Sequence, residues 1–362
     1  MTFLITFLLS TFFVLVLTPL ITRYANKNEW FDAVGGRKIH SGNIPRIGGI
    51  GIMVGCFLAF GLSIVIIQAL LPGRVRLQPS FYLLMAAGMG YQLLGLADDF
   101  RDLRARLKFI IQLALAAAVV ASGYYFRSVE IPVAPYVLRL GLVGPALTVF
   151  WIVGIANALN LIDGMDGMAG GIALIGSLVW ATLYLRTGQY LPALVALSVA
   201  GAILGFVFYN FPPASIFMGD SGSLFLGYVL AVLPLLGDPS DGIKTGLVPA
   251  ITICLIPILD TFAAILRRWR LGVSFFTPDM YHLHHKLLNL GLSVRQVLAI
   301  IYSFCGLLGF SVLVGVYVTP VLSFWFMMGS WAVWGAVIVL LHFLKERKVR
   351  LVWDEAKECA KE

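Results

Sequence analysis

The chain has 362 residues, of which 60% are hydrophobic and only 12% are charged, and its formal net charge is +8. A soluble protein carries about 25% charged residues, so this composition excludes an ordinary soluble domain and predicts an integral membrane protein. No basic stripe is interleaved with stacking aromatic residues, so the positive charge does not indicate nucleic-acid binding. In a membrane protein such an excess is typical of Lys and Arg at the cytoplasmic surface.

Apolar segments follow one another along most of the chain, and each approaches the roughly 20 residues that a membrane helix needs. Eleven spans are predicted, at residues 3–21, 47–71, 81–97, 109–126, 141–156, 169–185, 190–208, 223–236, 247–264, 297–317 and 321–343. Their apolar runs are continuous rather than alternating, which favours an all-α polytopic helix bundle over a β-barrel. We expect a single transmembrane domain over residues 1–343 and a charged cytoplasmic tail over residues 344–362.

The charges predict the orientation of this bundle. With the N-terminus outside, 20 of the 26 Lys and Arg residues and 15 of the 18 acidic residues fall on or next to segments that face inward. These inward segments are residues 22–46, 98–108, 157–168, 209–222, 265–296 and 344–362. The positive-inside rule then places the C-terminus in the cytoplasm. Inner loops of a passive bundle need no carboxylates, so we expect a multi-pass protein of the cell (inner) membrane with its active site facing the cytoplasm.

Two acidic motifs follow predicted spans. Asp98 and Asp99 are adjacent at the end of the third span, and such a pair is retained where a cation or a proton transfer uses it, the alternative being a solvated loop. Residues 157–167 follow the fifth span and place two amides and two carboxylates among glycines, which let a ligand approach the backbone closely. On a helical stretch Asn160 and Asp163 share a face, as do Asp163 and Asp166. A mere polar turn would not need so many amide and acid groups.

Two further motifs add a candidate metal ligand and a cluster of histidines. Asp220, in residues 217–223, suits either a helix N-cap or a hard-oxygen ligand for a divalent cation, and Phe217 could stack on a base. The cluster at residues 282–286 contains three histidines and a lysine. No Cys or Glu with zinc-site spacing accompanies the histidines, so phosphate binding is favoured over zinc, with a plain loop as the remaining alternative. Asp260 could pair with Arg267 on one helix face.

Together these residues describe a phosphate-handling site at the inner membrane surface. Magnesium is held by one or two carboxylates together with substrate phosphates, and phosphoryl chemistry depends on positioning and on charge neutralisation. Lys108, at the start of the fourth predicted span, could hold phosphate or simply snorkel to the interface. Lys38 and His40 precede the second predicted span and belong to the same inward face.

The four motifs, in this order, resemble those of the polyprenyl-phosphate N-acetylhexosamine-1-phosphate transferases, and the resemblance extends from Arg37 to His285. It implies that a polyprenyl phosphate, undecaprenyl phosphate in bacteria, attacks the β-phosphate of a UDP-amino sugar and releases UMP. Magnesium is needed, and Mn²⁺ is an expected substitute. The bilayer would present the lipid substrate, and the oligomeric state is open, a homodimer included.

The resemblance also implies roles for individual residues. Asp220 and Asn160 would bind the metal. Asp98 and Asp99 would form the catalytic acid pair, with Asp99 activating or orienting the lipid phosphate. The remaining implied site residues are the catalytic or nucleotide-sugar contacts Asp163 and Asp166, the uracil-stacking Phe217, the phosphate ligand Lys108, and the substrate contacts Lys38, His40, Asn157, His282, His284 and His285.

The histidine motif separates branches of this family. The His-Leu-His-His-Lys sequence resembles the branch that uses UDP-GlcNAc for surface polysaccharide or teichoic-acid-type polymers, with UDP-GalNAc as an open alternative. The branch that uses UDP-MurNAc-pentapeptide has three consecutive histidines followed by an aromatic residue and an acid. Two other classes stay open on the residues alone. The DDxxD-like shape of residues 98–102 is typical of membrane prenyltransferases, and a transporter would carry its polar groups near the bilayer midplane.

Overall fold

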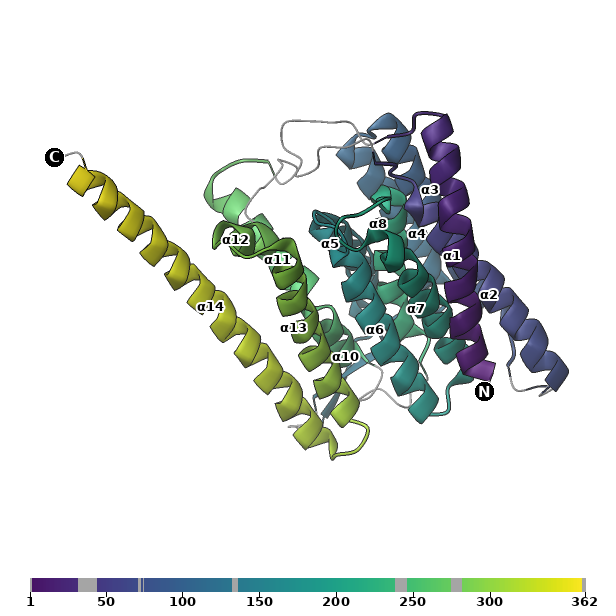
Figure 1. The fold of residues 1–362 in the computed structure, drawn as a ribbon. Helices are drawn as coiled ribbons and strands as arrows, with labels where there is room; N and C mark the ends of the chain where they lie inside the picture. Colours follow the sequence, from purple (N-terminus) through teal and green to yellow (C-terminus); the bar gives the residue numbers. More distant parts are fainter. Residues whose placement is uncertain are drawn as a thin grey trace.

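The computed structural model describes residues 2–31, 44–70, 73, 75–131, 136–237, 246–274 and 282–359. Its helices run side by side in a bundle, with the long α14 (Pro320–Cys359) at one edge (Figure 1). Eight described helices are long and apolar enough to cross a membrane. They are α1 (Thr2–Lys27), α2 (Gly48–Leu70), α3 (Pro79–Arg101), α5 (Val143–Ile162), α6 (Met168–Arg186), α7 (Tyr190–Asn210), α13 (Val294–Val314) and the Pro320–Leu340 part of α14. The prediction of an all-α, multi-pass membrane protein is therefore confirmed.

The other three predicted spans take different forms. The helix α4 (Ala105–Ala121) is shorter, and α8 (Gly219–Val232) is extended only by a 3₁₀ turn, η1 (Leu233–Leu235). Two helices, α10 (Leu247–Ile253) and α11 (Leu255–Arg270), replace the single span predicted at 247–264 and meet at a bend of 76°. Pro257 lacks the N–H that would bond to the Ile253 carbonyl of a continuous helix, which accounts for the break. The count of eleven crossings stays a prediction.

Three features of the fold were not predicted. A short antiparallel hairpin, β1 (Ser128–Ile131) and β2 (Tyr136–Arg139), lies between α4 and α5. The helix α5 continues to Ile162, six residues beyond its predicted end, because the amide motif joins the helix instead of leaving it. A short helix, α12 (Leu283–Asn289), contains most of the histidine motif. The division of the chain at residue 343 stays a prediction, and α14 runs through it.

The helix α8 lies at the centre of the bundle, and every one of its residues is buried. Glycines let its neighbours approach closely, as is common where membrane helices pack. A Cβ on Gly95 of α3 would lie 2.3 Å from the Asp220 carbonyl oxygen, and a Cβ on Gly49 of α2 would lie 2.3 Å from the Gly222 nitrogen. A Cβ on Gly227 would lie 2.6 Å from the Ala156 Cα of α5. The start of α8, which carries Asp220, is thus clamped between α2 and α3.

Candidate active site

The segment before α2 pairs with the segment before α8. The Phe217 N–H donates to the Pro45 carbonyl at 2.8 Å, and the Gly48 N–H donates to the Phe217 carbonyl at 2.9 Å. Gly219, the first residue of α8, has a φ of +68°, and a Cβ there would lie 2.5 Å from Asp99 Oδ2. A side chain at this position would therefore be strained and would displace Asp99. This pairing brings Arg46, which belongs to the segment before α2, to the start of α8.

Asp99 holds the first turn of α8 from the neighbouring helix α3. Its Oδ1 accepts from the Asp220 N–H at 2.8 Å, and its Oδ2 accepts from the Ser221 N–H at 3.0 Å. Arg46 Nε lies 3.2 Å from Asp99 Oδ1, and the Asp99 side chain is only 2% exposed. Asp220 itself is not the N-cap, which was one alternative, because Met218 occupies that position. Both oxygens of Asp99 are engaged here, and its activation of a lipid phosphate stays a prediction.

Asp220 and Asp98 alternate with two cations in one charged network. Arg46 Nη2 lies 2.6 Å from Asp220 Oδ1, and Lys108 Nζ lies 3.5 Å from Asp220 Oδ2. Lys108 Nζ also contacts Asp98 Oδ2 at 2.5 Å, while Asp98 Oδ1 accepts from the Leu103 N–H at 2.8 Å. The cations are more accessible than the acids, since the side chains of Arg46 and Lys108 are 36% and 23% exposed. Both can reach an anion from the solvent side.

The two amides of the second motif face different neighbours. Asn160 Nδ2 lies 3.4 Å from Asp220 Oδ2, and Asn160 Oδ1 accepts from the Ser223 hydroxyl at 2.6 Å. Asn157 Nδ2 instead donates to Gln112 Oε1 of α4 at 2.5 Å. Asn160 therefore belongs to the charged network. Asn157 ties α5 to α4, and its substrate contact stays a prediction.

The two carboxylates of the same motif lie in the loop between α5 and α6. Burial, followed by the negative charge of Asp220, raises the pKa of Asp163 to about 7. Asp166 is buried and its Oδ2 accepts from the Ala214 N–H at 3.0 Å. The next residue, Gly167, donates its N–H to Asn210 Oδ1 at 2.9 Å. Asp166 thus lies where the α5–α6 loop meets the segment before α8.

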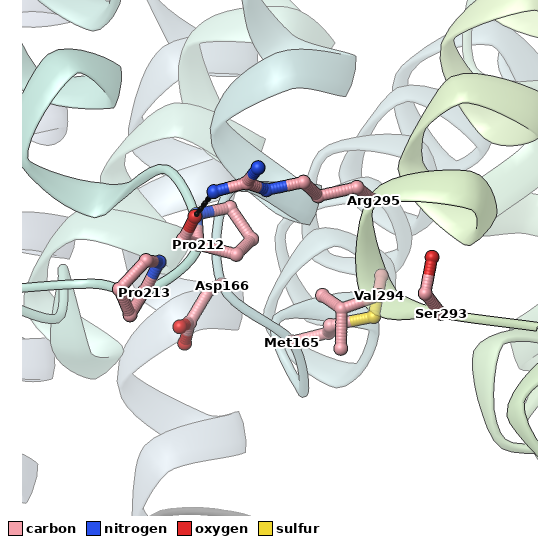
Figure 2. A pocket seen from close by; sticks show the side chains of 7 residues that line it. All are labelled: Met165, Asp166, Pro212, Pro213, Ser293, Val294 and Arg295. Atoms are coloured by element: carbon pink, nitrogen blue, oxygen red, sulfur yellow. Dashed lines mark hydrogen bonds between the residues drawn. The ribbon is translucent and has the colours of Figure 1, made fainter.

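A cavity of about 370 Å³ opens beside Asp166. Its lining includes Met165, Pro212, Val294 and Arg295 (Figure 2). Arg295 reaches from α13 to this loop and donates from Nη2 to the Pro212 carbonyl at 3.2 Å. The cavity has mostly apolar walls, with one acid and one guanidinium group beside them. It is large enough to admit part of an organic substrate next to the acidic loop.

The histidine motif is held by Asp260 of α11. Asp260 Oδ2 lies 2.7 Å from His282 Nδ1, and its Oδ1 accepts from the Leu283 N–H at 2.9 Å. Among the described residues, the ion pair of Asp260 is with His282 and not with Arg267, so the pairing considered from sequence is wrong. The physical reason is that the backbone amide at the start of α12 and the imidazole offer two donors to one buried carboxylate.

His284 is carried by α12 to the acidic loop. It is 1% exposed, and a Cβ on Gly164 would lie 3.0 Å from its Nε2. Its ring centroid is 4.1 Å from that of His285. Within the described parts of the chain, neither ring nitrogen of His284 has a hydrogen-bond partner. Burial, and then the neighbouring His285, lowers the pKa of His284 to about 4, so the ring is neutral at physiological pH.

The structure thus gathers the motifs at one end of the bundle. Among the sequence-predicted residues, Asp98, Asp99, Lys108, Asn160 and Asp220 form one connected group. His284 meets the loop of Asp163, while Phe217 is half-buried beside Asp220. Lys38 and His40 lie outside the described residues. No role was predicted for Arg46, Gln112, Asn210 or Ser223, although polar residues within apolar runs are a usable signal.

The donor atoms suit a magnesium ion that also binds water and substrate phosphates better than a metal ion held by protein ligands alone. In the described part of the chain, no three His, Cys, Asp or Glu residues converge closely enough to hold an ion. Among the described residues, Asp220 Oδ2 makes long polar contacts of 3.4 and 3.5 Å, so this oxygen can accept a closer ligand. Together with the Asn160 amide it offers hard oxygens. Magnesium commonly takes one or two carboxylates and fills its remaining positions with water and substrate phosphates.

The fold and the site define a multi-pass membrane protein whose acids and cations meet at the ends of buried helices. Residues 80–238 match the family model described as glycosyl transferase family 4. A probable undecaprenyl-phosphate N-acetylglucosaminyl 1-phosphate transferase of Bacillus subtilis (strain 168) is 36% identical over 321 residues, which cover 89% of this chain and 86% of that protein. A decaprenyl-phosphate N-acetylglucosaminephosphotransferase of Mycobacterium leprae is 31% identical, with coverages of 89% and 86%.

An undecaprenyl-phosphate alpha-N-acetylglucosaminyl 1-phosphate transferase of Salmonella typhi is 30% identical over 358 residues, which cover 97% of this chain and 91% of that protein. The chain therefore belongs to the family of polyprenyl-phosphate N-acetylhexosamine-1-phosphate transferases, and the resemblance drawn from its motifs is confirmed.

Proposed function

We propose that this protein transfers GlcNAc-1-phosphate from UDP-GlcNAc to undecaprenyl phosphate, giving undecaprenyl-pyrophosphoryl-GlcNAc and UMP. The observation that carries the proposal is the network of Arg46, Asp220, Lys108 and Asp98 at the start of α8. Two cations and several hard oxygens within one site suit a diphosphate and its metal. The names of the relatives, which all specify an N-acetylglucosaminyl phosphate and a polyprenyl phosphate, support the same donor and acceptor.

In the proposed reaction, an oxygen of the lipid phosphate forms a bond to the β-phosphorus of the donor. The bond from that phosphorus to the oxygen bridging the two phosphates breaks, and UMP leaves with the bridging oxygen. Lys108 and Arg46 are accessible cations and would bind the phosphate oxygens as negative charge shifts between them. Asp98 lies against Lys108, so it is the member of the acid pair that faces the phosphate site in this arrangement.

Asp220 and Asn160 would hold magnesium, with Mn²⁺ as a substitute. When bound, the metal would neutralise phosphate charge and draw the diphosphate toward the start of α8. The half-buried Asp163 and the neutral His284 lie next to this position and would contact the sugar-phosphate of the donor. Phe217 would stack on uracil, and the cavity beside Asp166 would give the nucleotide end of the donor room.

We further propose that this site faces the cytoplasm, at the inner membrane. The N-terminus would lie outside, and eleven crossings would place the C-terminus in the cytoplasm. The bias of Lys and Arg toward one set of loops supports this orientation. The product would serve as the first lipid-linked intermediate of a surface polysaccharide or teichoic-acid-type polymer. Homodimer formation stays a prediction that a mass measurement in detergent would check.

The test uses purified protein with undecaprenyl phosphate, radiolabelled UDP-GlcNAc and magnesium. We expect radiolabel in the lipid fraction and equimolar UMP. UDP-GalNAc and UDP-MurNAc-pentapeptide, assayed in parallel, should give much less product. Labelled lipid with no UMP would indicate a different reaction, and failure of a folded preparation with every UDP-amino sugar would refute the proposal.

A further inference from the structure

A second cavity, of about 660 Å³, lies at the opposite end of the bundle from the acids. It is surrounded by the N-terminal end of α3, the C-terminal end of α4, the turn between α6 and α7, and the end of η1. The acid pair Asp98 and Asp99 closes the other end of α3. A helix of 23 residues spans about 33 Å at 1.5 Å per residue, so the cavity is a membrane thickness away from the candidate active site.

Among the described residues that line this cavity, the charged side chains are both basic. They are Arg76 and Arg127, and no described carboxylate lines it. Both arginines are exposed, and the ion pairs recorded among the described residues involve other cations. Arg127 lies over the Tyr125 ring, with its guanidinium carbon 5.5 Å from the centroid. Two guanidinium groups from separate segments are therefore available to one anion.

The rest of the lining is amphipathic. Gln78 and Ser122 offer neutral hydrogen-bonding groups, whereas the half-buried Leu191 and Leu235 offer apolar surface. Phe81 is only 1% exposed and belongs to the packed interior below the cavity. A ligand that fits this lining has a charged head and an apolar continuation. A free ion would leave the apolar part of the cavity unused.

We propose that this cavity binds the phosphate group of an anionic glycerolipid at the membrane surface opposite the active site. Guanidinium groups bind phosphate through paired, charge-assisted hydrogen bonds. The helix ends around the cavity lie at the level where lipid headgroups begin, so the phosphate meets the arginines while the glycerol and first acyl carbons lie against Leu191 and Leu235. Isolated Arg and Tyr residues at an interface merely anchor a helix. Here they line a concave site of a size typical for organic ligands.

The experiment compares lipid binding by native mass spectrometry of the full chain in detergent. Wild-type protein, the double variant Arg76→Ala/Arg127→Ala and the control Arg186→Ala are titrated with phosphatidylglycerol and with phosphatidylcholine. Arg186 ends α6 at the same end of the bundle, outside the cavity, and lies over the Tyr317 ring at 4.8 Å. We expect phosphatidylglycerol to bind the wild type and the control at least about tenfold more tightly than the double variant.

Several outcomes would overturn the proposal. They are equal binding of phosphatidylglycerol by the wild type and the double variant, equal binding of the two lipids by the wild type, or an equal loss in Arg186→Ala. If the alanine variant does not fold, Arg76→Gln/Arg127→Gln takes its place under the same criteria. Glycerol 3-phosphate is added as a competitor. Displacement of the lipid identifies a soluble phosphate ester as a sufficient ligand, and retention of the lipid identifies the lipid as the source.

The site is separate from the proposed transfer reaction. We expect the double variant to keep its transferase activity in detergent, because both arginines lie far from the acidic motifs. Loss of lipid binding with retained turnover would support the cavity proposal alone. Absence of turnover in all three proteins would bear only on the proposed function.

Discussion

Replacing Asp163 with Asn should stabilise the ligand-free protein at alkaline pH. Burial and the nearby charge of Asp220 raise the pKa of this carboxyl from 3.8 to about 7. Between pH 4 and 7, the folded protein therefore holds a proton at Asp163 that the unfolded chain, with a pKa near 3.9, has lost. The free energy of unfolding falls as the pH rises through this window and levels off above about pH 7.

The size of the effect follows from the shift. A change of about three pKa units at about 1.4 kcal/mol each gives an upper value of about 4 kcal/mol. Asp163 is only half-buried, so screening by water reduces this to about 2–4 kcal/mol. Asn has nearly the same shape and carries no charge. The variant should therefore match the wild type near pH 4 and exceed it in stability near pH 8.

Thermal unfolding, followed by tryptophan fluorescence in detergent with EDTA, measures the difference across this pH range. The exposed Asp102, in the loop after α3, gives the matched control Asp102→Asn, which should follow the wild type at every pH. Parallel pH profiles for Asp163→Asn and wild type would refute the reasoning, because they would mean that Asp163 is ionised in the folded protein well below neutrality. Transferase turnover of Asp163→Asn should fall even as its stability rises, since removal of charge strain in an active site also removes its chemistry.

Three other predictions, on Asp220, Asp260 and Gly219, test the site. Asp220→Asn should lower turnover by about a hundredfold or more and raise the magnesium concentration needed for half-maximal activity, and an unchanged magnesium titration would remove this residue from the metal site. Asp260→Asn should lower turnover at least about tenfold. Combining it with His282→Gln should lower turnover little further, because the two residues act as one unit. Additive losses in the double variant would contradict the pairing. Gly219→Ala should lower both the unfolding temperature and the turnover, whereas Gly154→Ala, where a Cβ meets open space, should change neither.

The transmembrane helices exposed to lipid were predictable because lipid leaves no other solution for their backbone. Long apolar runs such as α2 and α13 therefore appear within three residues of where the sequence places them. The segments around α8 and α10 were less predictable. They are shielded by other helices, so a short helix or a sharp bend does not expose backbone polar groups to lipid. Hydropathy does not distinguish such segments from full spans.

The acids of the site could be named from sequence, but their pairings could not. Asp99 bonds to backbone amides 121 and 122 residues away, and Asn157 bonds to Gln112, 45 residues away. Spacing offered Asp260 a possible partner on its own helix, Arg267, yet Asp260 contacts His282, 22 residues later. These hydrogen-bond and ion-pair partners depend on which helix ends meet in space. Periodicity along a single helix carries no information about that.

The position of Asp99 also determines how phosphate can be bound. The free amides at a helix N-terminus are a ready anion site, and α8 begins at the centre of the charged network. Asp99 already accepts from the N–H groups of Asp220 and Ser221, so a phosphate finds these donors taken and a negative charge beside them. In the proposed site, binding would then come from the side chains of Arg46 and Lys108 and from a metal on Asp220. Under the proposed function, Asp99 would thus make phosphate binding depend on side-chain cations and a metal rather than on the backbone amides of α8.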